Sequence, residues 1–423
     1  MKNAGIPVLT PRLRFPEFRD AGAWTTETLD SVVAISTEKV GDNTCIPMSI
    51  TSGVGLVSQM DKFGRVIAGS SYKNYLLLKK NDFAYNKSAT KDHPEGFIAL
   101  YSSDELAAVP NSIFTCFRIK GDSPAPQYLN YLLLGNLHGR WLRKFIEVGA
   151  RAHGSLSIDE DDLLALPVPL PTGKTSLHEQ QKIADCLTSV DELIAAQARK
   201  VDALKTHKKG LMQHLFPREG ETQPRLRFPE FRGAKEWKIR KAGSLFANRI
   251  AKGEQGLPIY SVTMHDGMVR RDSFERNFYD IENASGNKKV CKNDVAYNMM
   301  RMWQGALGVA PENCLVSPAY IVLAPLDGTI PDFFQYFFKL PETLRLLTSH
   351  SRGLTKDRLR LYYDDFARIP LRCPAPAEQQ RIAVCLTSLD DLIAAQTQKL
   401  DALQTHKKGL MQQLFPLAEE VEA

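Results

Sequence analysis

The sequence predicts an α+β protein in which two globular domains are separated by two long antiparallel coiled-coil helices, with a pseudo-two-fold internal repeat. Three observations predict this class. Segment 176–217 returns almost unchanged at 375–416, at a constant offset of 199 residues. Segment 11–19 (PRLRFPEFR) returns at 224–232, so each half opens as well as closes with a shared pattern. Between these repeats lie short β-branched and aromatic runs bounded by Gly, Pro and Asn, which is typical of strands.

Each variable segment is predicted to be a mixed globule. Strands are expected at 96–100, 113–119 and 319–323, helices at 127–134 and 333–340, and extended Pro-rich arms at 166–171 and 369–374. Landmarks persist between the two segments, since NDFAYN at 81–86 matches NDVAYN at 293–298. A common scaffold with different surface loops accounts for this pattern.

The closing repeats predict two long helices whose apolar residues recur at alternating steps of four and three, the a and d positions of a heptad. Gln197, Lys208, Gln396 and Lys407 interrupt the seam at matching places. Because each stripe is narrow, we predict that the helices pack on each other; the alternative is two amphipathic helices on separate cores. The seam residues are Ile183, Leu187, Val190, Ile194, Val201, Leu204 and Leu211 in the first copy, and Ile382, Leu386, Leu389, Ile393, Leu400, Leu403 and Leu410 in the second.

Start and stop signals support both helices. Ser176 and Glu179 form a capping-box pattern at the first helix, and Pro376 suits the first position of the second. Pro217 and Pro416 stop the two helices.

These signals divide the chain into five predicted parts. They are a shared opening segment (1–23), a first globular domain (24–171), a central helix (172–217), a second globular domain (218–374), and a closing helix with its tail (375–423).

Composition narrows the class of protein. No apolar run approaches the length of a membrane span and the start lacks a signal-peptide core, so we expect a cytoplasmic protein without a membrane partner. The seven cysteines are scattered without a C-x-x-C pair, which predicts neither a disulfide framework nor a zinc site. A net charge of +6 and a pI near 8.8 are compatible with a polyanionic partner.

The motifs predict no catalytic residue and no metal ligand. Gly173-Lys174-Thr175 resembles the end of a phosphate-binding loop, but Val168 stands where the first glycine is required. The sequence contains no [DN]PP[YF] motif of adenine methylation, no HExxH and no GxSxG. Asp159–Asp162 fits an acidic helix start as well as a metal site.

Polar loops remain as the candidate binding surface. Lys, Arg, Asn, Ser and aromatic side chains gather at similar places in the two halves, and these are the side chains that contact phosphates and base edges. The predicted DNA-binding residues are Lys73, Asn86, Lys87, Lys91, Arg151, His153 and Ser155 in the first half, and Asn298, Arg301, Trp303, Gln304, Arg352, Thr355 and Lys356 in the second.

The doubled arrangement resembles the specificity subunit of a type I restriction-modification system. The resemblance rests on an RFPEF opening before a tryptophan, a Pro-rich arm into EQQxIA, and a helix ending KKGLMQxLFP, each present twice. It implies that each globule is a target-recognition domain for one half of an asymmetric, split DNA sequence. The implied partners are double-stranded DNA, two modification (methyltransferase) subunits and two restriction subunits.

The resemblance also implies that this chain is not itself an enzyme and binds no cofactor. The complex would use S-adenosylmethionine for N6-adenine methylation, and ATP with Mg for translocation and cleavage. Two other classes are weighed beside it: a coiled-coil scaffold that binds proteins and no DNA, and a lone enzyme, which the missing motifs oppose. A salt-dependent shift on duplex DNA separates the first reading from the scaffold.

Overall fold

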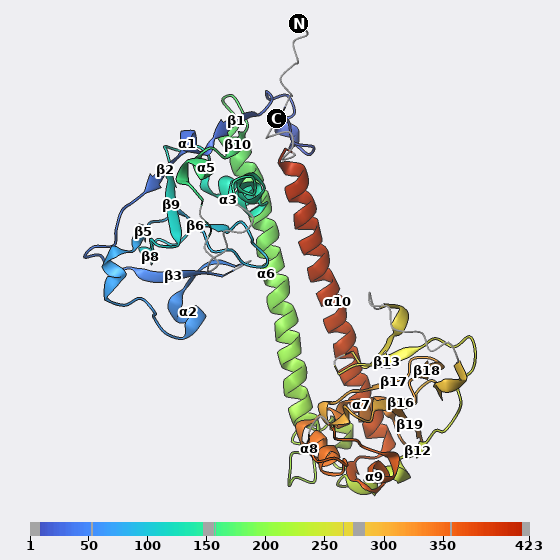
Figure 1. Cartoon of the computed structure of the whole chain (residues 1–423). Coiled ribbons are helices and arrows are strands. Elements are labelled where there is room, and N and C mark those ends of the chain that lie inside the picture. The colour runs from blue at the N-terminus through green and yellow to red at the C-terminus, as the bar shows by residue number, and fades with distance from the viewer. Residues whose placement is uncertain are drawn as a thin grey trace. The chain divides into compact units, whose positions relative to one another are not determined.

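The computed structural model describes residues 9–51, 54–146, 156, 158–264, 266–273, 284–355 and 358–416. Two long helices, α6 (Ser176–Leu215) and α10 (Pro376–Leu414), run through it (Figure 1). The chain divides into two compact units: unit 1 holds Met1–Gln197 and Lys399–Ala423, and unit 2 holds Ala198–Gln398. Each unit therefore contains a part of both long helices.

The two units share their order of strands, while their short helices differ in places. Unit 1 contains η1 (Pro16–Phe18), β1 (Thr25–Thr28), α1 (Leu29–Val32), β2 (Val33–Ser36), β3 (Ile46–Thr51), β4 (Gly55–Ser58), α2 (Gln59–Phe63), η2 (Ser70–Asn74), β5 (Leu76–Leu78), β6 (Phe83–Asn86), β7 (Phe97–Leu100), β8 (Ala107–Val109), β9 (Phe114–Ile119), α3 (Pro126–Leu134), α4 (Leu137–Leu142), α5 (Glu160–Leu164) and β10 (Pro167–Leu170). Unit 2 contains η3 (Pro229–Phe231), β11 (Lys238–Lys241), η4 (Ala242–Ser244), β12 (Phe246–Asn248), β13 (Tyr260–Val262), β14 (Met268–Arg270), η5 (Arg271–Ser273), η6 (Ala284–Gly286), β15 (Lys288–Val290), β16 (Val295–Asn298), η7 (Met302–Gln304), β17 (Leu307–Val309), β18 (Cys314–Val316), β19 (Tyr320–Pro325), α7 (Pro331–Phe338), α8 (Pro341–Ser349), α9 (Tyr363–Arg368) and β20 (Pro370–Cys373).

The main sheet repeats with the same topology, whereas the four-stranded sheet β4-β3-β8-β5 of unit 1 is replaced in unit 2 by two two-stranded sheets, β13-β14 and β15-β18. The order β2-β9-β6-β7 in unit 1 becomes β12-β19-β16-β17 in unit 2, and all these pairs are antiparallel. The Pro-rich arms are strands, since β10 pairs with β1 and β20 pairs with β11. Prolines are tolerated there because each pair is a two-stranded ribbon with free edges. The predicted α+β class and internal repeat are confirmed.

The repeated Asn-Asp landmark is structural. Asn81 and Asn293 both adopt the left-handed conformation, with φ of 72° and 71°. The buried carboxylate that follows accepts a backbone hydrogen bond of 2.8 Å from Lys79 in unit 1 and from Cys291 in unit 2. An arginine balances its charge in both units. Asn tolerates this backbone conformation better than most residues, and this explains why the pair is retained.

The arginine that balances this aspartate comes from a different strand in each unit. Arg118 of β9 lies with Nε 2.6 Å from Asp82, whereas Arg249, just after β12, donates over 3.0 Å to Asp294. Since β9 and β2 are neighbours, as are β19 and β12, either strand delivers the guanidinium to the same place.

The predicted capping box at the start of α6 is wrong. Glu179 does not turn back to the helix start; its carboxylate accepts hydrogen bonds from Arg14 Nε (2.7 Å) and Trp24 Nε1 (3.3 Å). A buried carboxylate needs a charged partner, and the arginine of the opening repeat supplies one. Ser176 instead donates to the carbonyl of Pro171 over 2.5 Å.

The long helices run antiparallel within each unit, and every predicted seam residue is buried or half-buried. In unit 1, Ile183 and Leu187 of α6 share a core with Leu414 of α10 and with α3. In unit 2, Leu215 of α6 shares a core with Leu386 of α10 and with α7. The seam therefore serves both the helix pair and the globular part of each unit.

The lysines that interrupt the seam make equivalent ion pairs, which we call the clamps. In unit 1, Lys407 Nζ lies 2.6 Å from Asp191 Oδ1, and Tyr131 donates to the same carboxylate over 2.9 Å. In unit 2, Lys208 pairs with Asp390, to which a tyrosine again donates, over 2.7 Å. Each clamp joins both long helices to the helix that follows the main sheet.

In the part of the chain that the structure describes, none of the helices combines the length and apolar character that a membrane crossing requires.

Candidate nucleic-acid interface

Two of the predicted loops meet in unit 2. The backbone of Leu361 donates to the carbonyl of Met299 over 3.0 Å, and the Tyr297 hydroxyl donates to the carbonyl of Leu361 over 3.2 Å. The loop after β16 is thereby joined to the segment between α8 and α9. We call the described residues of these two segments, 299–304, 350–355 and 358–362, the unit 2 loop cluster. It brings the predicted residues Arg301, Trp303, Gln304, Arg352 and Thr355 to one region.

The first segment of the cluster offers a cation beside a half-exposed indole. Arg301 and Gln304 are exposed, and Trp303 is half-buried with its Nε1 donating to the carbonyl of Met300 over 3.2 Å. Together with Met300 they line a hollow of about 360 Å³. The Asn298 amide oxygen accepts from the backbone of Met300 over 3.0 Å, so this side chain shapes the loop.

The second segment is rich in arginine. Arg352 is held by Asp365, with an Nε to Oδ2 distance of 2.6 Å, and this hydrogen-bonded partner raises the pKa of the guanidinium. Thr355 is exposed, and Lys356 lies outside the described residues. Sequence analysis missed Arg358 and Arg360, which are also exposed. In the sequence, Arg358 follows Arg352 by six residues and Arg360 follows Arg358 by two, and this run of arginines was the available signal.

The unit 1 loop after β6 contains the predicted residues Lys87 and Lys91. Lys87 extends the sheet, because its backbone donates to the carbonyl of Ile113 over 2.9 Å and its carbonyl accepts from Leu156 over 2.8 Å. Lys91 is exposed. The segment just before Leu156 holds Arg151, His153 and Ser155, all three of which lie outside the described residues.

Two other predicted residues of unit 1 occupy different environments. Asn86 is only 8% exposed, and its amide oxygen accepts from the backbone of Ser88 over 2.9 Å, so it holds the turn and presents little surface. Lys73 is exposed and pairs with Asp42 over 2.7 Å. Its segment packs on a separate small core around Val40.

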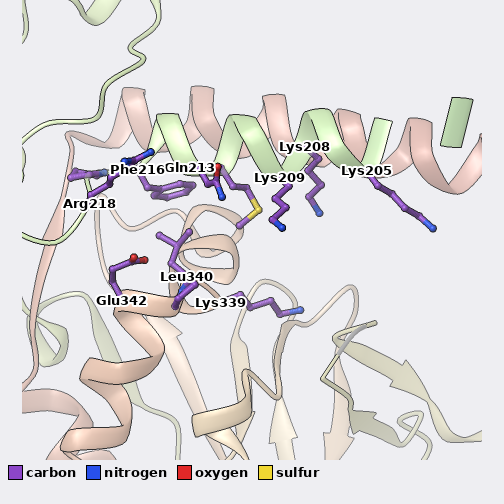
Figure 2. A pocket seen from close by; sticks show the side chains of 12 residues that line it. Lys205, Lys208, Lys209, Gln213, Phe216, Arg218, Lys339, Leu340 and Glu342 are labelled. Carbon is purple, nitrogen blue, oxygen red and sulfur yellow. The ribbon is translucent and has the colours of Figure 1, made fainter. Parts of the chain in front are cut away.

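A second surface feature is a groove present in both units. In unit 2 it measures about 600 Å³ and lies between the last turns of α6 and the α7–α8 connection. Figure 2 shows Lys208 and Lys209 projecting from α6 toward Lys339, with Phe216 farther along the same side. Burial, and secondarily the nearby Lys208, lowers the pKa of Lys339. The groove combines an apolar floor with crowded cations.

The unit 1 groove measures about 750 Å³ and uses the repeat counterparts on α10. Lys407, Lys408, Met411 and Phe415 take the places of Lys208, Lys209, Met212 and Phe216. Arg12 and Arg140 add further positive charge. We call the two features the repeat grooves.

Metal and thiol chemistry each require a particular arrangement of side chains. Among the described residues, no three His, Cys, Asp or Glu side chains are grouped to hold a metal ion. The seven cysteines are free thiols, and burial raises the pKa of Cys116 to about 12, which disfavours a reactive thiolate.

Comparison of the sequence with known proteins identifies the families and proteins that it resembles. Residues 235–405 match the model of the type I restriction modification DNA specificity domain. The chain is 24% identical over 352 residues to the putative type I restriction enzyme MjaX specificity subunit of Methanocaldococcus jannaschii, across 79% of this chain and 77% of that one. The second half of the chain is therefore similar to a type I restriction modification DNA specificity domain. Over most of its length the chain is similar to a specificity subunit.

Solved structures agree on the fold. The crystal structure of the type I restriction-modification S subunit from M. genitalium superposes with a TM-score of 0.58 at 15% identity, covering 97% of this chain and all (100%) of that one. A chain from a study of complex assembly and conformational transition of the type I R-M system gives 0.53 at 16% identity, covering 93% and 97%. These likenesses extend over both units.

Proposed function

We propose that each unit of this chain reads one half of an asymmetric, split DNA sequence. The observation that carries the proposal is one scaffold built twice with different residues at the same loops. After β6 the loop presents Lys87 and Lys91, whereas after β16 it presents Arg301 and Trp303. Identical scaffolds with different contact residues suit two different half-sites, because base edges are read by the side chains and not by the sheet.

The chain supplies binding and positioning in this proposal, and its partners supply the chemistry. Modification subunits, using S-adenosylmethionine, methylate adenine at N6, and restriction subunits, using ATP with Mg, translocate and cleave. The recognised sequence selects where both reactions occur.

The repeat grooves are proposed to receive the modification subunits. Two equivalent grooves on one chain support two copies of one partner. Lys208 is paired with Asp390, but four further cations line the groove beside one carboxylate, Glu342: Lys205, Lys209, Arg218 and Lys339. An apolar segment carrying acidic side chains is therefore the complementary occupant. A Met212→Glu variant and a Met411→Glu variant should each bind one modification subunit fewer by native mass spectrometry, while Lys200→Glu, an exposed position of α6 outside the groove, should bind the full number.

Modified-base sequencing tests the DNA-reading proposal. Cells that express the complex should carry N6-methyladenine at one split motif, and deleting this gene should remove that motif. Arg301→Ala should relax the half-site read by unit 2 alone, and Lys91→Ala should affect the other half-site alone. A motif that persists without the gene would contradict the proposal and favour a protein-binding scaffold.

A further inference from the structure

Leu354 is the most exposed large apolar side chain among the described residues. Its relative exposure is 100%, against 85% for Ile250, the next in order. Burying a leucine side chain is strongly favourable, so an aliphatic group held wholly in water is poised to gain from insertion into an apolar environment.

The local backbone holds Leu354 in this position. Arg352 and Arg360 exchange two backbone hydrogen bonds of 2.9 and 2.8 Å, which closes the base of the loop. Gly353 has a φ of +144°, and a Cβ there would lie 2.5 Å from the carbonyl oxygen of Arg358. Only glycine fits this close approach. Leu354 therefore directly follows two residues whose backbone positions are fixed, Arg352 and Gly353.

Positive charge surrounds the exposed leucine. A hollow of about 610 Å³ is lined by three arginines and one carboxylate, together with Leu354 and Tyr362: Arg352, Arg358, Arg360 and Asp364. Arg352 is engaged by Asp365, but no ion pair joins Arg358 or Arg360 to a carboxylate within the described part of unit 2. Arg360 donates instead to the Met300 sulfur over 3.8 Å, which ties the hollow to the other half of the unit 2 loop cluster.

We propose that Leu354 is a wedge that enters the base stack of the bound duplex and partly unstacks one base step, while Arg358 and Arg360 hold the adjoining phosphates. The inference rests on the proposed DNA-reading function and adds a shape-dependent contribution to it. An apolar side chain flanked by cations is the combination by which proteins grip the backbone and open a base step. Steps that unstack easily would be favoured at this point of the unit 2 half-site.

The test uses the full chain with its modification subunits and a duplex that carries the motif found by modified-base sequencing. 2-Aminopurine, whose fluorescence rises on unstacking, replaces one base at a time through the half-site assigned to unit 2. Wild-type complex should raise the signal at one step. Leu354→Ala should abolish that rise and weaken binding roughly tenfold. Ile250→Ala, which removes another exposed apolar side chain of the same unit, should leave both unchanged.

Each result decides between specific alternatives. An equal rise with Leu354→Ala, or no rise with wild-type complex that still binds the duplex, would overturn the wedge and leave the DNA-reading function standing. Loss of a modification subunit in place of duplex affinity would show that Leu354 contacts protein, and would also overturn it. Failure of the wild-type complex to bind the duplex would refute the DNA-reading function itself.

Discussion

Arg14 and Glu179 are separated by 165 residues in sequence, yet Arg14 Nε lies 2.7 Å from Glu179 Oε1. Their side chains are 8% and 1% exposed. In unit 2, Arg227 and Glu378 reproduce the pair at 2.7 Å, again with a tryptophan donating to the same oxygen. The opening and closing repeats are therefore parts of one buried polar site in each unit, which fastens the start of the repeat to the first turn of a long helix.

Glu179→Gln should destabilise unit 1 by about 3 kcal/mol, because it leaves the Arg14 guanidinium buried without a countercharge. Glu378→Gln should do the same to unit 2. Hydrogen exchange followed by mass spectrometry should locate the loss of protection in the unit that carries the substitution. Glu192→Gln, an exposed position on the same helix as Glu179, is the matched control. Equal loss in both units would show that the two sites are not independent.

Lys407→Met should remove a clamp that is partly open to solvent, with side-chain exposures of 21% for Lys407 and 39% for Asp191. Solvent screens such a pair, so a coupling energy of about 0.5–1 kcal/mol is expected from a double-mutant cycle with Asp191→Asn. Denaturant unfolding supplies the four free energies. Lys399→Met, exposed on the same helix, should have little effect. A coupling energy near zero would show that the clamp does not stabilise unit 1.

Arg358→Ala and Arg360→Ala should weaken binding to every duplex alike and reduce the slope of log K against log salt by about one each, because each removes one phosphate contact. Sequence preference should stay the same. Titrations at several salt concentrations, on the methylated motif and on an unrelated duplex, measure both quantities. A change confined to the motif would mean that these arginines contact bases.

Acid should destabilise unit 1 through His138. Burial lowers the pKa of this histidine to about 4, although Glu95 opposes that shift and His93 adds to it. Among the described residues, its Nδ1 has no hydrogen-bond partner. The unfolded chain takes up the proton near pH 6.5, so the stability present above that pH is lost as the pH falls toward 4.

The expected loss between pH 7 and pH 5 is about 2 kcal/mol. Urea unfolding of wild-type protein and of His138→Gln at both pH values measures it, with His207→Gln, exposed on α6, as the control. The pH dependence should shrink in His138→Gln alone. An unchanged dependence in that variant would assign the acid sensitivity to other groups.

The helix pair was accessible from sequence because a heptad seam repeated at matching phases is a strong local signal. The roles of the residues that depart from these local patterns could not be predicted from the sequence. Lys208 and Lys407 interrupt the pattern, and their aspartate partners lie on the other long helix, far away in sequence. Glu179 fits a local capping rule, yet its partner is Arg14. Ion pairs between residues far apart in the sequence produce no periodic sequence pattern, so only the three-dimensional structure identifies them.

The candidate interface could be predicted only in outline. Residue type correctly marks Arg301 and Arg352 as exposed loop residues, but it cannot separate a side chain that faces solvent from one that holds a turn. Asn86 illustrates the second case. Arg358 and Arg360 lie just beyond the polar stretch recognised in the sequence, and only the closure of the loop at Arg352 brings them to it.

The clamps also bear on how such a chain arose. Asp191 and Lys208 both lie on α6, and their counterparts Asp390 and Lys407 both lie on α10. One copy of the repeat thus encodes both charges, and an ancestral protein of half this length could close its helix on a second copy of itself. Tandem duplication of its gene would turn that pairing into one chain without a new interface. Drift in either copy would then change the loops of one unit and leave those of the other unit unchanged.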